Sequence, residues 1–136
     1  MSDFANSDTT IMPGFGSPAQ RQYSADNNQS AGTSSYTLTF SPGVRRGYAR
    51  LRTKGSTAVP PTQSATGVVT TSLKVTASDG TRTYTLRNYP ASLGAANENL
   101  DITIPFNLDI VAVTFVFTLV TTTAAVYVDV EVVAGN

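Results

Sequence analysis

The sequence has 136 residues, contains neither histidine nor cysteine, and carries nine basic and nine acidic side chains, so its formal net charge is zero. The absence of both residue types excludes Ser-His and Cys-His nucleophile pairs, thiolate metal sites and imidazole zinc sites. One domain fits this length, and the lack of cysteine and of an apolar leader predicts folding in a cytoplasm without a signal peptide.

Charged side chains are sorted along the chain. Residues 1–44 carry a formal charge of −2, residues 45–87 carry +7 and residues 88–136 carry −5. This sorting predicts one basic and one acidic side, which favours association with further copies or with an acidic shell. In the alternative interpretation, each charge simply lies wherever its strand faces water.

Residues 1–34 are rich in small and polar residues and show neither the strand period of two nor the helix period of about 3.6. They are predicted to form an extended polar N-terminal arm, and residues 35–136 the body. Such an arm is ordered only when it lies against a partner or the body. Its candidate contact residues are Phe4, Met12, Phe15, Arg21 and Tyr23.

Two strands are predicted at the start of the body, over residues 36–40 and 47–53. The first alternates apolar residues with threonines, and Ser41-Pro42-Gly43 is expected to end it. The second places cations on one face and Ala49 and Leu51 on the other. Its basic face is expected to meet solvent or a partner. The densest group of cations comprises Arg45, Arg46, Arg50, Arg52 and Lys54.

A β-hairpin is predicted around Asp79-Gly80, the clearest turn signal in the chain. If these residues form a two-residue type I′ turn, Ser78 pairs with Thr81 and Leu73 with Leu86. That register places apolar residues on one face and polar residues on the other, which supports the hairpin.

The last third predicts core strands over residues 100–104, closed by Pro105, then over 108–120 and 124–133. In the final strand, alternate valines lie opposite Tyr127, Asp129 and Glu131. Burying each such valine, leucine or phenylalanine contributes roughly 1.5–3 kcal/mol. Seven or eight short strands with no convincing amphipathic helix predict an all-β fold, a jelly-roll-like antiparallel β-sandwich.

Residues 110–128 hold no charge and are about long enough to span a bilayer, but their threonines and β-branched residues favour two buried strands, so no membrane contact is expected.

Two carboxylate pairs, Asp101 with Asp109 and Asp129 with Glu131, could serve glycoside hydrolysis. Asp101 with Asn97 and Asn99 could bind calcium. Because the carboxylates fit solvent-facing strand positions, we expect no catalytic residue, no metal site and no cofactor.

The basic cluster and Tyr48 also suit nucleic acid, through phosphate contacts and base stacking. Against this interpretation, the chain is neutral and its last third is acidic. An acidic protein surface is therefore the expected partner, with no direct nucleic-acid contact.

The polar arm, the Thr/Val-rich β body over Ser35 to Val133, the absence of cysteine and the charge layout resemble the cement, or decoration, proteins of jelly-roll type that coat the heads of tailed bacteriophages. The resemblance implies a structural virion protein on the capsid exterior. Many copies would clamp neighbouring major capsid protein subunits against internal DNA pressure, with the arm extended over a neighbour. Exposed edge strands also predict a symmetric dimer.

Two other functions fit the same pattern. One is a receptor- or glycan-binding β module of a virion fibre or spike, although few loop aromatics are present. The other is the coat protein of a small RNA virus. This chain ends in strands and has no strongly basic arm, and both features count against that function.

Overall fold

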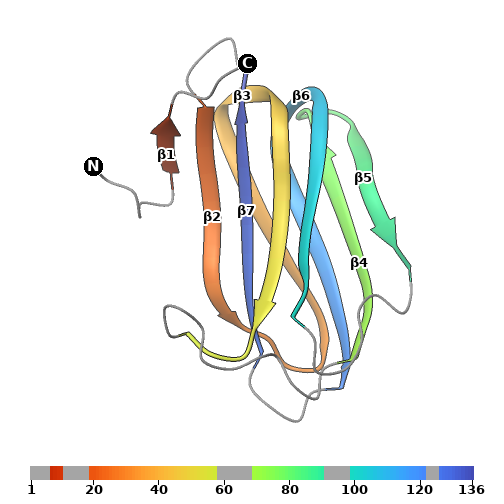
Figure 1. Cartoon of the computed structure of the whole chain (residues 1–136). Helices are drawn as coiled ribbons and strands as arrows, with labels where there is room; N and C mark the ends of the chain where they lie inside the picture. Colours follow the sequence, from red (N-terminus) through yellow and green to blue (C-terminus); the bar gives the residue numbers. More distant parts are fainter. Residues whose placement is uncertain (1–6, 11–18, 58–68, 91–98, 122–125) are drawn as a thin grey trace.

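The computed structural model describes residues 7–10, 19–57, 69–90, 99–121 and 126–136 (Figure 1). All regular elements in these ranges are strands: β1 (Ser7–Thr10), β2 (Ala19–Asn28), β3 (Gly32–Lys54), β4 (Val69–Ser78), β5 (Thr83–Tyr89), β6 (Asp101–Thr121) and β7 (Tyr127–Gly135). They pair in the order β1-β2-β7-β3-β6-β4-β5, and each pair is antiparallel. None of the described segments is a helix that could span a membrane.

The long strands β3 and β6 pass through both layers of a sandwich. The first half of β3, to Thr39, pairs with the second half of β6. From Arg46 onward β3 pairs with the first half of β6 on one side and with β7 on the other. Register shifts between Thr39 and Arg46 mark the bend, which lies at the top of Figure 1. Strands that bend at such irregularities can pass from one sheet to the next.

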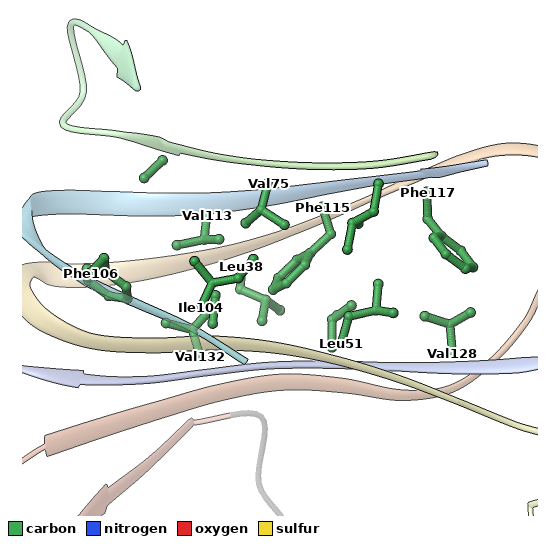
Figure 2. Packing of buried hydrophobic residues seen from close by; sticks show 14 of the residues in the cluster. Leu38, Leu51, Val75, Ile104, Phe106, Val113, Phe115, Phe117, Val128 and Val132 are labelled. Carbon is green, nitrogen blue, oxygen red and sulfur yellow. The ribbon is translucent and has the colours of Figure 1, made fainter. Parts of the chain in front are cut away.

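One layer therefore contains β1, β2, β7, the second half of β3 and the first half of β6. The other contains the remaining halves of β3 and β6 with β4 and β5. Apolar side chains fill the space between the layers (Figure 2). The largest fully buried ones include Phe115, Phe117, Leu51, Leu73, Ile110 and Leu119. The predicted jelly-roll-like antiparallel β-sandwich is confirmed.

The predicted alternation is confirmed in both strands that later form the site. Ala49 and Leu51 are buried while the cations of β3 face outward. The even-numbered valines from Val126 to Val132 are likewise buried. Gly47 is required where β3 approaches β7, because a Cβ atom there would lie 1.9 Å from the carbonyl oxygen of Val133.

Two predicted strand ends are wrong. Ser41-Pro42-Gly43 lies inside β3 and Pro105 inside β6, so four predicted segments are halves of two bent strands. Proline lacks the N–H that a strand ladder needs, and it is tolerated at bends and on edges. Pro42 lies at the bend, where the β3–β6 pairing is interrupted. Pro105 lies in the half of β6 that pairs, among described residues, with β3 alone.

The expected arm contains two strands of the sheet. β2 pairs with β7 from Gln20 to Asn28, and β1 pairs with β2. A bulge between Ser24 and Asn27 places Asp26 in the left-handed region at φ 57°. The period of two was hidden because β2 has polar residues on both faces, and β3 begins at Gly32 rather than at position 35.

The predicted hairpin is present, but its register differs. Ser78 pairs with Thr83 instead of Thr81, and Leu73 pairs with Tyr89 instead of Leu86. The Asp79 side chain accepts bonds of 2.8 and 2.7 Å from the backbone N–H groups of Thr81 and Arg82, and a bulge between Val75 and Thr76 shifts the pairing of Leu73 by one further position. These bonds stabilise a four-residue loop over 79–82, with Gly80 at φ +97°.

Candidate functional site

The outward surface of β2, β7, β3 and the first half of β6, here called the charged face, brings together the basic and acidic parts of the sequence. The β3–β7 register places Arg50 opposite Glu131 and Arg52 opposite Asp129. On the other side of β3, Arg52 lies opposite Asp101. The prediction of separate basic and acidic sides is therefore wrong for this face, because antiparallel pairing makes the +7 and −5 segments neighbours.

Arg50 and Arg21 each hold a carboxylate. Arg50 donates from Nε and Nη2 to the two oxygens of Asp101 at 2.8 and 2.7 Å, a bidentate pair. Arg21 Nε donates to Glu131 at 2.6 Å, and the hydroxyl of Tyr48 donates to the other oxygen of Glu131 at 3.3 Å. These contacts fix the orientation of both guanidinium groups.

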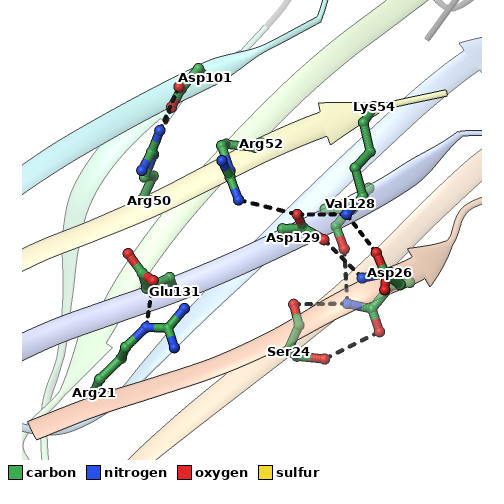
Figure 3. A network of polar contacts seen from close by, with 11 residues as sticks. Arg21, Ser24, Asp26, Arg50, Arg52, Lys54, Asp101, Val128, Asp129 and Glu131 are labelled. Atoms are coloured by element: carbon green, nitrogen blue, oxygen red, sulfur yellow. Dashed lines mark hydrogen bonds and ion pairs between the residues drawn. The ribbon is translucent and has the colours of Figure 1, made fainter. Parts of the chain in front are cut away.

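Lys54 joins β3 to the neighbouring strand β7 and to β2 beyond it (Figure 3). Its Nζ lies 2.5 Å from Asp26 and 3.0 Å from Asp129. Asp129 also accepts from the backbone N–H of Asp26 at 2.8 Å and from Arg52 at 3.4 Å. The bulge in β2 is thus what presents Asp26 to this network. The side chains of Lys54 and Asp129 are only 13% and 12% exposed, so solvent weakens this pair less than the others.

The charges shift several pKa values. The hydrogen bond from Arg50 lowers the pKa of Asp101, although burial opposes it. Burial acts to lower the pKa of Lys54, but the bonds to Asp26 and Asp129 together outweigh it and raise that pKa. Burial and the adjacent Glu131 raise the pKa of the Tyr48 phenol. At neutral pH Lys54 and Asp101 therefore both carry their charges.

A groove of about 270 Å³ runs over the charged face. The guanidinium of Arg21 lies over the ring of Tyr23, with its Cζ 4.3 Å from the ring centroid, a cation–π contact. The groove is lined by Arg21, Tyr23, Ala25, Asp26, Arg50, Arg52, Lys54, Asp129, Val130 and Glu131.

The structure separates the sequence-predicted contact residues into three groups. Arg21, Tyr23, Arg50, Arg52 and Lys54 meet in the groove. Arg45 and Arg46 lie apart from it at the bend, while Phe4, Met12 and Phe15 are outside the described residues.

Sequence reasoning missed Asp26, Asp129 and Glu131 as members of the groove. Alternation along β7 did place Asp129 and Glu131 on one outward face. No sequence signal paired that face with β3, whose residues are about 80 positions away.

Three of the four carboxylates considered for hydrolysis are paired with cations. Arg50 keeps Asp101 ionised, which opposes its use as a proton donor. Asp109 lies at the bend, whereas Asp129 and Glu131 are held by cations. Within the described ranges no cluster of three or more acidic residues could hold a metal ion, and Asn97 lies outside those ranges.

No protein-family model and no curated protein sequence matches the chain. Solved structures to which the chain is similar include three variants of CBM29-2, from work on ligand recognition by family 29 carbohydrate binding modules. They are 10% to 11% identical to this chain, with TM-scores of 0.41 to 0.44. The alignments cover 96% of this chain and 78% to 79% of theirs. The chemistry of the groove depends on this chain's own residues.

Proposed function

We propose that this chain is a noncatalytic carbohydrate-binding module and that the groove on the charged face holds a saccharide. One observation carries the proposal: planar charged side chains, held in place by one another, line a groove around a tyrosine on an open sheet face. A ligand site of this kind needs a concave surface, an apolar contact and a few fixed polar groups.

The polar groups suit the hydroxyl groups of a sugar. A guanidinium offers several N–H donors in one plane and a carboxylate offers two acceptor oxygens, so each can bond two adjacent hydroxyls. Arg52 is half exposed and touches Asp129 through one nitrogen at 3.4 Å. Its guanidinium therefore retains donor capacity for a ligand.

Tyr23 supplies the apolar contact. An aromatic ring offers a flat surface on which the C–H groups of a sugar ring can pack. The cation–π contact with Arg21 restrains the ring of Tyr23 from one side. Restraint before binding matters because ordering a flexible side chain costs about 0.5–1.5 kcal/mol on association.

The test is a glycan array followed by affinity electrophoresis in gels that contain soluble polysaccharides. Tyr23→Ala is expected to weaken binding at least about ten-fold, as loss of a central aromatic contact does. Tyr84→Ala is the matched control, since Tyr84 is an exposed tyrosine of β5 outside the groove. Wild-type affinity in Tyr23→Ala would remove the groove as the site. A folded protein that binds no saccharide would refute the proposed function.

A second candidate is the capsid-clamping role implied by the resemblance to cement proteins, and the bend of β3 favours it. Arg45 and Arg46 are exposed there and border a hollow of about 440 Å³ with Asn107 and Asp109. Among the described residues Arg45 makes no ion pair. Adjacent exposed cations suit an acidic surface of a major capsid protein on the virion exterior.

Binding to purified capsids that lack the chain tests this second candidate. The double variant Arg45→Glu and Arg46→Glu is expected to lose capsid binding. The same charge change at Arg82 and Arg87, next to and within β5, provides the control. If wild-type protein does not bind capsids, or binds without raising the temperature at which they rupture, the clamping role is wrong.

A further inference from the structure

Each of the four cations that line the groove is paired with a carboxylate, and this pairing selects a class of saccharide. We infer that the groove takes uncharged saccharide chains and discriminates against chains that carry carboxylate or sulfate groups. The inference rests on the proposed function and adds the chemical class of its ligand.

Each cation of the groove lies against a carboxylate. β3 carries more basic than acidic residues. Strand pairing brings the acidic residues of β2, β6 and β7 to the same face of the sheet, where they neutralise these basic residues. The four pairs span 2.5 to 3.4 Å and comprise Arg21 with Glu131, Arg50 with Asp101, Arg52 with Asp129, and Lys54 with Asp26. Three of the four carboxylates line the groove with the cations, Asp101 lies outside that lining, and the formal charge over the eight groups is zero.

An anionic saccharide would meet this arrangement unfavourably. Its carboxylate or sulfate could reach a cation only by approaching the carboxylate already bound there or by displacing it. Displacement of Asp129 from Lys54 would leave that carboxylate with its 3.4 Å contact to Arg52 and the bond from the Asp26 N–H. Because the Asp129 side chain is only 12% exposed, water replaces the lost contact with Lys54 poorly.

A hydroxyl group avoids both problems. It can donate to a carboxylate lone pair while accepting from a guanidinium N–H, because each oxygen of a carboxylate accepts more than one bond. The ion pairs then stay intact on binding. Since no net charge is neutralised, affinity for a neutral chain is expected to depend weakly on salt.

The wild-type protein decides the inference directly. Isothermal titration would compare hexasaccharides of neutral hexoses, including glucose and mannose, with a hexamer of galacturonate. The neutral chains are expected to bind at least about ten-fold more tightly, with a dissociation constant that changes less than about two-fold between low and physiological salt. Tighter binding of the galacturonate hexamer would overturn the inference and leave the proposed function standing. Binding of neither class to folded protein, confirmed on the glycan array, would refute the proposed function itself.

Asp129→Asn then tests the cause. The amide keeps the shape and an acceptor oxygen but removes one negative charge beside Arg52 and Lys54. Affinity for the galacturonate hexamer is expected to rise at least about three-fold, by charge complementarity. Asp109→Asn makes the same charge change at the bend, away from the groove, and should leave that affinity unchanged. An equal effect of both variants, or no effect of Asp129→Asn in a folded protein, would contradict charge balance as the basis of selection.

Discussion

The phenol of Tyr36 donates a 2.6 Å hydrogen bond to the side-chain oxygen of Gln29, whose residue is 3% exposed. Gln29 follows β2, and its backbone N–H donates to the carbonyl of Val126 just before β7. Gln29 thus connects the end of β2 with β3 through its side chain and with the start of β7 through its backbone. This connection fixes to the sheet a segment that resembles a loose arm in the sequence.

Removing either partner of this bond should destabilise the fold. Gln29→Ala leaves the Tyr36 hydroxyl without its acceptor, and Tyr36→Phe leaves the amide oxygen without its donor. Each is expected to lower the free energy of unfolding by about 1–3 kcal/mol, the cost of an unsatisfied buried polar group. Urea denaturation measures it, with Asn28→Ala at an exposed neighbouring position as the control. Additive effects in the double variant would argue against direct coupling.

Gly47→Ala tests the close approach of β3 and β7. The added methyl group would overlap the backbone of Val133 and Ala134, and backbone atoms cannot move aside as a side chain can. Overpacking of this kind costs about 1–3 kcal/mol. Thermal and urea unfolding should show the loss, whereas Ser35→Ala, at an exposed position of the same strand, should change stability little. Unchanged stability in Gly47→Ala would mean that the two strands lie farther apart.

Lys54→Met tests the partly buried ion pairs that line the groove. The variant leaves Asp26 and Asp129 without their shared cation, which should cost about 1–2 kcal/mol at neutral pH, between the values for exposed and for buried pairs. Because the pKa of Lys54 is raised in the folded protein, the deficit relative to wild type should be complete below the unfolded lysine pKa and should shrink as pH rises through the folded pKa. Lys74→Met removes an exposed lysine of β4 and serves as the control in the same urea titrations. A deficit that does not vary with pH would indicate lost packing rather than lost pairing.

Asp79 and Asp101 should make stability fall in acid. The backbone N–H groups of Arg82 and Thr81 lower the pKa of Asp79, and Arg50 lowers that of Asp101. Because each folded pKa lies below its unfolded value, the stabilisation is complete above the unfolded pKa. It is lost as pH falls through the folded pKa.

NMR titration of the two carboxyl groups measures these values directly. Both midpoints are expected below the usual aspartate value. In Asp101→Asn, urea stability should depend less on pH across the acidic range than in wild type. A midpoint for Asp101 at or above the usual aspartate value would contradict the bidentate pair with Arg50.

The sequence alone determined the strand-forming segments of the body and their buried faces, because the period-two pattern is local. Leu38, Phe115 and the alternate valines of β7 could be assigned to the core in this way. The hairpin was equally local, although its register depended on side-chain bonds from Asp79 that a turn dipeptide does not reveal.

Only the tertiary structure decided that β3 and β6 bend through both layers, that β2 belongs to the sheet, and that a groove exists. Arg21 and Glu131 are 110 positions apart, and their contact depends on β2 and β7 pairing in one register. Charge on a segment shows that it can attract a partner, but the strand order selects which segment becomes that partner. In this sheet the acidic strand β7 lies between β2 and β3, which both carry basic groups. The opposite charges therefore attract one another within the molecule, whether or not a ligand is bound.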